Sequence, residues 1–306
     1  MKKIQVYLTT YNRPHLVEKA IDSILNQSFN SYELIISDNS TNDYTKTIVE
    51  KKYFDKVRYI HRIPTDPDHF NTILKDVDSE YFMIFHDDDV MHSSMLDTLY
   101  RKIIARREVI AIGSNARVVK NGKLKRSLFC EHLKKDIEIE NRNQMVQAYF
   151  KTGIVPLPSY LYRVEVAHKL RFNFSHGGKH CDAAFIIDLL NLGPVIFCAC
   201  PLMDFYIHSG QDSFNNAFRD RIKLVNYITN TTSYNRRDKI FKEFRMRNLY
   251  AELKKELLSE RTILSKKYCT IIKLIFEVSP FEYFPKMMLI RIYAYLFKKK
   301  RPGNVI

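Results

Sequence analysis

The 306-residue chain has only five cysteines, and no pair of them has the spacing of a zinc site. The odd count and the lack of a secretion signal argue against a disulfide framework. Cys198 and Cys200 lie two positions apart in the apolar run 195–200, so we expect both to pack on one face of a strand. We interpret all five as ordinary thiols, which excludes functions built on zinc or disulfide chemistry.

The sequence also lacks a long apolar run. No stretch approaches the roughly 20 apolar residues of a membrane-spanning helix. At the N-terminus, Ile4–Leu8 is too short for the core of a secretion signal and is interrupted by Gln5. Internal repeats and low-complexity linkers are missing as well. We therefore expect a cytoplasmic protein.

Acidic residues are scarce in the last third of the chain. Residues 215–306 contain 21 Lys and Arg against 8 Asp and Glu, so they carry most of the net charge of +15. The first 214 residues are almost neutral. We therefore divide the chain into a domain at 1–214 and a basic, amphipathic helical extension at 215–306, and we expect the extension to meet a negatively charged partner.

Strand and helix patterns alternate in the first half of the chain. Helical spacing of apolar residues begins at Pro14, and further helices are expected near 41–51, 67–75 and 95–106. Repeated units of this kind predict a Rossmann-like α/β fold with a mostly parallel sheet flanked by helices. The strands expected between the helices are Ile4–Leu8, Leu34–Ile36, Val57–Ile60, Tyr81–Phe85 and Val109–Ile112.

The pattern changes after residue 115. Asn121-Gly122 predicts a type I′ hairpin turn, and helices are expected at Gln144–Phe150 and His180–Leu192. Pro156 and Pro158 interrupt the segment between these helices, and strands are expected through 195–208. From about residue 214 onward we expect mainly amphipathic helix.

Three consecutive carboxylates, Asp87, Asp88 and Asp89, follow the apolar strand Tyr81–Phe85. Adjacent carboxylates repel one another unless a cation lies near them, and grouped oxygen ligands suit Mg²⁺ or Mn²⁺. In open α/β sheets, ligands bind at the carboxyl ends of strands, where this group falls. The alternative interpretation is a solvated acidic turn that caps a helix starting near Ser94.

Two further strand ends carry polar residues that suit a nucleotide. After the first strand, Tyr11 can stack on a base. After the second, Asp38 can accept a hydrogen bond from the N–H edge of the base, although the segment 38–40 also fits a simple turn or helix cap.

The ordered set of these motifs resembles the family 2 glycosyltransferases of GT-A fold. It comprises Thr9-Thr10-Tyr11-Asn12-Arg13-Pro14, Asp38-Asn39-Ser40 and the later carboxylates, and Ser23–Phe29 is similar to the end of the family's first helix. The resemblance covers roughly residues 2–215. It implies a GT-A catalytic domain whose nucleotide-sugar half spans about 1–114 and whose acceptor half spans about 115–214. It also implies inverting transfer from a nucleotide diphosphate sugar with Mn²⁺ or Mg²⁺.

The resemblance also implies roles for single residues. Asp88 would be the leading metal ligand and Asp89 a second, while His86 stands where the family's aspartate-any-aspartate signature would begin, which leaves the number of ligands open. His208, in a segment similar to a later family loop, would approach the metal or diphosphate, or else be structural. The nucleotide would be bound by Thr9, Tyr11 and Asp38 at the base, Asp87 near the ribose, and Arg13.

The catalytic base implied by the resemblance is Asp182. The segment Gly177–Asp182 is similar to the region before the family's catalytic helix, where Glu-Asp is common and this chain has Cys181-Asp182. A carboxylate there would deprotonate the acceptor hydroxyl. The alternative is that Asp182 only opens the helix that follows, where a negative charge is favourable. His176 and Lys179 are weaker candidates for contact with the acceptor or the diphosphate.

The basic extension admits two interpretations. Aromatic and basic residues interleave up to Lys298-Lys299-Lys300-Arg301, which suits a helix lying on an anionic membrane surface. The enzyme would then be peripheral at the inner face of the cell membrane, beside a lipid-linked acceptor. The extension could instead cap the catalytic domain and expose its lysines to solvent.

We therefore predict a metal-dependent inverting glycosyltransferase that uses a nucleotide diphosphate sugar, with UDP favoured, in the synthesis of a cell-surface polysaccharide such as lipopolysaccharide or capsule. The acceptor would be a saccharide or a lipid-linked saccharide. A nucleotidyltransferase ranks lower because Leu8–Pro14 contains no glycine to grip a triphosphate. A nucleic-acid-binding protein ranks lowest because no zinc-finger or RNA-recognition signature is present.

Overall fold

The computed structural model describes residues 2–65, 68–208, 218–235, 237–244 and 246. The chain divides into two compact units, Met1–Phe214 and Asn215–Ile306.

The first half of unit one is built on a parallel sheet. Its strands are β1 (Ile4–Thr10), β2 (Tyr32–Asp38), β3 (Arg58–His61) and β4 (Tyr81–His86), hydrogen-bonded in the order β3-β2-β1-β4. All of β1 is buried, as expected of a central strand with helices on both sides. The predicted α/β architecture is therefore confirmed.

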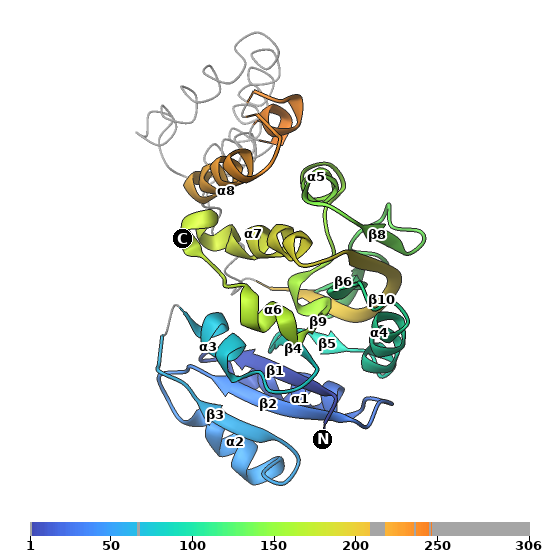
Figure 1. The fold of residues 1–306 in the computed structure, drawn as a ribbon. Coiled ribbons are helices and arrows are strands. Elements are labelled where there is room, and N and C mark those ends of the chain that lie inside the picture. Colours follow the sequence, from blue (N-terminus) through green and yellow to red (C-terminus); the bar gives the residue numbers. More distant parts are fainter. Residues whose placement is uncertain (1, 66–67, 209–217, 236, 245, 247–306) are drawn as a thin grey trace, which may run out of the picture. The chain divides into compact units, whose positions relative to one another are not determined.

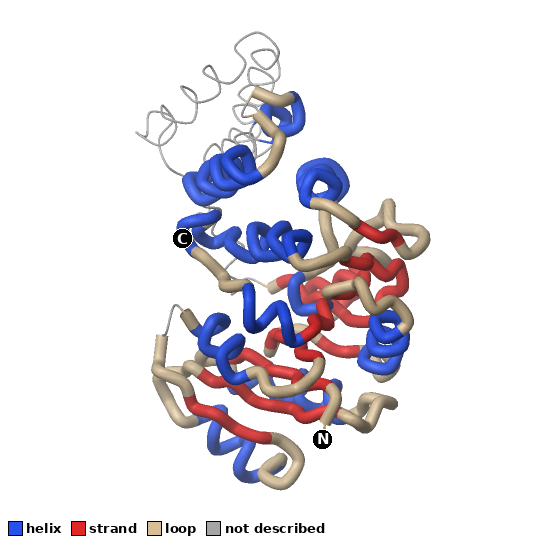
Figure 2. The backbone as a smooth tube through the Cα atoms, viewed as in Figure 1, coloured by secondary structure: helices blue, strands red, loops and turns tan. Residues whose placement is uncertain are grey.

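Helices cover both faces of this sheet (Figures 1 and 2). On one face, α1 (Pro14–Leu25), α2 (Tyr44–Lys52) and α4 (Met95–Ile104) share an apolar core with alternate residues of β1. On the other face lies α3 (His69–Asp76), whose Asp76 carbonyl accepts a hydrogen bond from Tyr7. The period of two along each strand thus sends neighbouring side chains into two separate layers.

The sheet continues from β4 in the order β9-β6-β10-β5. Strands β6 (Ala111–Lys120) and β10 (Val195–Ile207) are parallel to each other, whereas β9 (Tyr160–Arg163) runs antiparallel to both β4 and β6. Strand β9 was not predicted from the sequence. Two further unpredicted strands are β5 (Val90–Met91), antiparallel to β10, and β8 (Ile137–Ile139), also paired with β10.

The predicted hairpin is present between β6 and β7 (Lys123–Arg126). Asn121 and Gly122 have φ angles of 51° and 71°, as the two central residues of a type I′ turn require. The prediction for the two neighbouring cysteines was wrong, because Cys198 is buried and Cys200 is exposed. The register of β10 on β6 shifts between Cys198 and Pro201, so the strict alternation of faces fails there.

The remaining helices of unit one are short. They are α5 (Arg142–Gln147), which continues as a π-helical turn at Ala148–Thr152, α6 (Val164–Lys169) and α7 (Cys181–Asp188). Single 3₁₀ turns occupy Leu157–Ser159, Phe174–His176, Gly178–His180 and Leu189–Asn191.

In unit two, α8 (Phe218–Thr231) buries Leu224, Val225 and Ile228. Within the residues that the structure describes, no helix is both long and apolar enough to cross a bilayer. Most of the predicted basic extension, residues 247–306, lies outside the described residues.

Candidate active site

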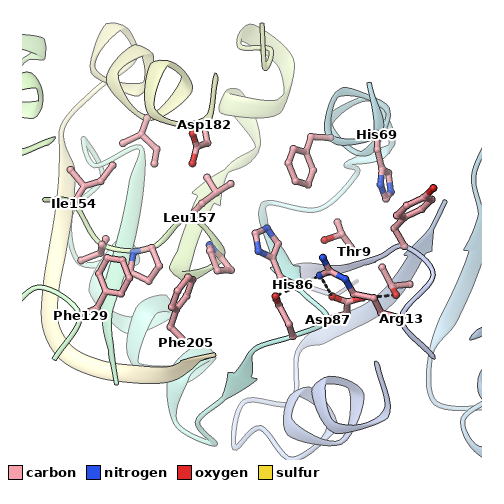
Figure 3. Close-up of a pocket in the computed structure, with 18 of the residues that line it drawn as sticks. Thr9, Arg13, His69, His86, Asp87, Phe129, Ile154, Leu157, Asp182 and Phe205 are labelled. Atoms are coloured by element: carbon pink, nitrogen blue, oxygen red, sulfur yellow. Dashed lines mark hydrogen bonds and ion pairs between the residues drawn. The ribbon is translucent and has the colours of Figure 1, made fainter. Parts of the chain in front are cut away.

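A pocket of about 660 Å³ opens at the carboxyl ends of β1 and β4. Figure 3 shows its two dissimilar sides. Thr9, Arg13 and Asp87 lie on a polar side, while Phe129 and Leu157 belong to an apolar side. The parallel topology brings the strand ends together, because the carboxyl ends of parallel strands share one edge of the sheet.

Asp87 is fixed by hydrogen bonds on both of its carboxylate oxygens. Its Oδ2 accepts from Thr10 Oγ1 at 2.7 Å and its Oδ1 from Arg13 Nη1 at 3.2 Å. Burial raises the pKa of Asp87 to about 6, although Thr10 and Arg13 oppose the increase. The alternative of a solvated acidic turn does not fit a carboxylate that is only 3% exposed.

Asp88 lies between three cationic or imidazole groups. Its Oδ2 accepts a hydrogen bond from His208 Nε2 at 2.9 Å and is 3.6 Å from Arg13 Nη1. Burial alone would raise the pKa of Asp88, but His86, His208 and Arg13 together hold it below its ordinary value. Asp88 is therefore ionised at neutral pH.

Asp89 is almost completely buried. Its Oδ1 accepts a hydrogen bond from the Tyr206 backbone N–H at 2.9 Å, which ties this carboxylate to β10. Among the described residues, its Oδ2 has no hydrogen-bond partner. Burial, with the negative charge of Asp88, places the pKa of Asp89 well above its ordinary value. A cation near Oδ2 would offset the free-energy cost of burying this carboxylate in its charged form.

These side chains fit a divalent cation. One ligand atom each from His86, Asp88 and Asp89 lie within 4.8 Å of one another. The Nε2 of His86, like the Oδ2 of Asp89, is buried and has no hydrogen-bond partner within the described part of the chain. Oxygen and imidazole donors in this number suit a cation that keeps further positions for substrate. His208 reaches the same group through Asp88.

The polar side of the pocket contains four of the residues predicted to bind a nucleotide, namely Thr9, Tyr11, Arg13 and Asp87. The Tyr11 side chain is 44% exposed, so its ring face is accessible for stacking. The Thr9 hydroxyl donates to the Phe85 carbonyl at 3.1 Å, which leaves its oxygen as an acceptor. Asn39, His69 and Phe70 also line this side and were not predicted.

The structure does not bring Asp38 to the surface of the pocket. This side chain is fully buried, and its two oxygens accept from the Ser40 N–H and the Tyr59 hydroxyl, each at 2.8 Å. These bonds fit the alternative that residues 38–40 form a simple turn. Asn39, rather than Asp38, lines the pocket. Contact between Asp38 and a base stays a prediction.

The apolar side is formed by residues that are distant in sequence. The segment 153–158 lies with Phe129 and Phe205 around this part of the pocket (Figure 3). Gly113 in β6 makes the close packing of this segment possible, because a Cβ there would lie 2.6 Å from Val155 Cγ2. The only sequence signals were Gly153, which has a φ of 85°, and the two prolines.

Asp182 enters the pocket from the first turn of α7 (Figure 3). Its Oδ1 accepts a hydrogen bond from the Ala183 backbone N–H at 2.8 Å. The residue thus supports the start of the helix and faces the cavity, so the two interpretations of this aspartate are compatible. His176 and Lys179 are not among the residues that line the pocket.

Comparison with known proteins identifies a family. Residues 5–171 match the model of glycosyl transferase family 2. A GalNAc(5)-diNAcBac-PP-undecaprenol beta-1,3-glucosyltransferase of Campylobacter jejuni is 32% identical over 154 residues, which cover 49% of each chain. Poly(ribitol-phosphate) beta-N-acetylglucosaminyltransferase TarP of Staphylococcus aureus is 36% identical over 111 residues, 33% of this chain and 32% of TarP. The chain therefore spans about half or less of the length of these relatives.

Solved structures share the fold. Residues 1–349 of S. aureus TarS in complex with UDP superpose with a TM-score of 0.66 at 16% identity, covering 99% of this chain and 94% of that one. The mannosyltransferase PcManGT of Pyrobaculum calidifontis, in complex with GDP-Man and Mn²⁺, gives a TM-score of 0.51 at 16% identity, covering 98% and 88%. At this level of identity the likeness concerns the fold alone.

Proposed function

The chain belongs to glycosyl transferase family 2 and is a glycosyltransferase, and from this premise we propose that it transfers a sugar from a UDP-sugar to a saccharide or lipid-linked saccharide, with inversion and with a divalent metal. The observation that carries the proposal is the pocket itself. It combines a polar side, side chains that can bind a metal, and a carboxylate on the facing helix.

The polar side supports binding of a nucleotide diphosphate. Tyr11 offers a ring for the base, and Arg13 offers a guanidinium group for a phosphate oxygen beside Asp87 and Asp88. UDP is favoured because the TarS fragment, which shares the fold, was solved with UDP and with UDP-GlcNAc. Asp87 would accept hydrogen bonds from the ribose, as its position beside the nucleotide residues suggests.

The metal would be held by Asp88 and Asp89, with Mn²⁺ or Mg²⁺ as the candidates, and His208 would approach it through its hydrogen bond to Asp88 Oδ2. When bound, a divalent cation would stabilise the negative charge that grows on the departing diphosphate. Arg13 adds a fixed positive charge on the same side of the pocket, 3.6 Å from Asp88. Arg13 also helps to keep the donor oriented between the charged groups and the aromatic ring.

The base would be Asp182. An inverting transfer needs the acceptor hydroxyl to attack from the face of the sugar opposite the leaving group, and a carboxylate must take its proton. Asp182 lies on α7, across the pocket from the residues of the polar side (Figure 3). A sugar placed between them would present opposite faces to the diphosphate side and to Asp182.

The acceptor would lie against the apolar side of the pocket. The side chains of Phe129, Leu157 and Phe205 suit the apolar face of a pyranose ring. Two of the relatives are named for an undecaprenol-linked saccharide and a poly(ribitol-phosphate), which favours an acceptor in cell-surface polysaccharide synthesis. The chain belongs to glycosyl transferase family 2, and no observation among the described residues favours a nucleotidyltransferase or a nucleic-acid-binding protein instead.

The proposal is tested by thermal unfolding of the full chain with UDP, GDP, dTDP or CDP, with and without Mn²⁺. A ligand at about 100 times its Kd stabilises the native state by about 2.7 kcal/mol, which raises Tm by a few degrees. We expect the largest increase with UDP and Mn²⁺ together, and its loss in Asp88→Asn. The exposed Asp55→Asn serves as the matched control and should respond like the unmodified chain.

Two outcomes would contradict parts of the proposal. Stabilisation by another nucleotide, but not by UDP, would overturn the donor assignment and leave the reaction class unchanged. Full sugar transfer in EDTA would overturn the metal dependence and leave the rest of the proposal unchanged.

A further inference from the structure

His86 is the last residue of β4 and stands directly before the three carboxylates. The side chain lines the pocket, but its Nε2 atom is buried. Within the described part of the chain, this nitrogen has no hydrogen-bond partner. Burying an imidazole nitrogen without a hydrogen bond reduces the stability of the folded state, so its presence at this point requires an explanation.

The ring of His86 is held by aromatic packing. Phe70 lies parallel to it, with 6.2 Å between the ring centroids and 8° between their planes. Phe70 is in turn fixed against Phe172, whose ring centroid is 5.1 Å away. This stack comes from α3 and from the segment before α7, so the orientation of the imidazole does not depend on a hydrogen bond.

Two carboxylates lie beside the imidazole. Ligand atoms of His86, Asp88 and Asp89 are all within 4.8 Å of one another, which leaves room for one cation between them. The Oδ2 of Asp89, on a side chain that is 1% exposed, is the second buried atom of this group that has no hydrogen-bond partner among the described residues. A cation bound in this group would lie beside both side chains that carry an unpaired buried atom.

We propose that His86 is a direct nitrogen ligand of the cation, and that the resulting His86–Asp88–Asp89 site selects Mn²⁺ over Mg²⁺. This inference rests on the metal dependence in the proposed function and adds to it a ligand and a preference. Mg²⁺ is bound by oxygen atoms and gives up its waters reluctantly, whereas transition metals accept imidazole nitrogen readily. An imidazole ligand in this group therefore penalises Mg²⁺ more than Mn²⁺.

The test measures binding of Mn²⁺ alone to the full chain, without donor or acceptor. Electron paramagnetic resonance gives the Kd, because free Mn²⁺ has a six-line signal that is lost on binding. Pulsed measurements on the same samples detect the magnetic coupling of a directly bound ¹⁴N nucleus. We expect this coupling in the unmodified chain and in His208→Gln, and its absence in His86→Gln.

Affinities provide the second readout. We expect His86→Gln to weaken Mn²⁺ binding by about tenfold or more. Competition with Mg²⁺ should show a smaller loss of Mg²⁺ affinity, so the preference for Mn²⁺ decreases. In His86→Asp, which supplies an oxygen ligand, binding of both ions should persist without nitrogen coupling. This second variant keeps the test valid if His86→Gln does not fold.

Different results would contradict the assignment of His86 and the existence of the metal site. Mn²⁺ bound without nitrogen coupling in the unmodified chain, or coupling that disappears only in His208→Gln, would overturn the assignment of His86. Absence of Mn²⁺ binding at millimolar concentration would overturn the site. Sugar transfer from UDP-sugar, measured separately, shows whether the proposed function survives either result.

Discussion

At the scale of single residues, Asp182 combines two tasks that one substitution can separate. Its Oδ1 accepts from the Ala183 N–H at 2.8 Å, and an asparagine in its place can keep this bond through its amide oxygen. The amide cannot take a proton from an acceptor hydroxyl. Asp182→Asn therefore removes the proposed base and leaves the first turn of α7 supported.

We expect Asp182→Asn to lower kcat by about 10²–10⁴-fold, while the Kd of the donor changes little. Steady-state kinetics with UDP-sugar and acceptor give kcat, and calorimetry gives donor binding. Thermal unfolding serves as the control for the helix. A lower Tm with normal kcat would show that Asp182 only supports the start of α7.

The residues of the site differ in how far the sequence could predict them. Asp87, Asp88 and Tyr11 follow strands directly, so the topology of a parallel sheet is sufficient to bring them together. The same rule places Asp38 at the sheet edge, but it does not predict that the Tyr59 hydroxyl donates a hydrogen bond to one of the Asp38 oxygens. Phe205 reaches the pocket only through tertiary packing, which no local pattern records.

At the scale of elements, an ionic network joins three strands near the carboxylates. Asp204 of β10 accepts from Arg117 of β6 at 2.6 and 2.9 Å, and it lies 2.9 Å from the imidazole of His92, which follows β5. Burial would raise the pKa of Asp204, but the bonds from Arg117 and His92 hold it below its ordinary value. The network therefore stabilises the edge of the sheet that carries β5 and β10.

The lowered pKa sets the pH dependence. Since the folded state binds the Asp204 proton less readily than the unfolded state, the stabilisation is present at neutral pH and is lost as pH falls through the folded pKa. We expect Asp204→Asn to reduce the free energy of unfolding by about 1–2 kcal/mol at pH 7, a modest value because Arg117 is partly exposed. Below the ordinary pKa of aspartate, the difference should shrink toward zero.

Denaturant unfolding across this pH range provides the measurement. Asp97→Asn, which breaks the more exposed pair with Arg101 on α4, is the matched control and should have a smaller effect. A difference between Asp204→Asn and the unmodified chain that persists at low pH would mean that packing, rather than charge, accounts for the loss.

Elements were predictable where periodicity alone determines them. The helix of Pro14–Leu25 and the hairpin at Asn121-Gly122 follow from local spacing and turn chemistry. Strand β9 has only four residues and directly follows the turn that contains Pro158, so its signal resembles that of a loop. Its position between β4 and β6 is decided by the burial of Tyr160 and Tyr162 in the assembled core.

At the scale of the whole molecule, the distribution of charge is the main feature. Residues 215–306 contain 21 Lys and Arg and 8 Asp and Glu, against near balance in the remainder. Each cation near an anionic bilayer contributes about 1 kcal/mol at low ionic strength. We therefore predict that the full chain binds vesicles containing anionic lipid, and that it does not bind vesicles of zwitterionic lipid alone.

The prediction is tested by cosedimentation with vesicles at increasing salt. Replacing Lys298, Lys299, Lys300 and Arg301 by Gln should weaken binding by at least about tenfold, and added salt should reduce the difference because it screens surface charge. The matched control replaces four exposed cations of the β6–β7 hairpin, Lys120, Lys123, Lys125 and Arg126, and should bind like the unmodified chain. Equal loss in both variants would mean that net charge alone drives binding. Absence of binding in the unmodified chain would favour the alternative that the extension only caps the catalytic domain.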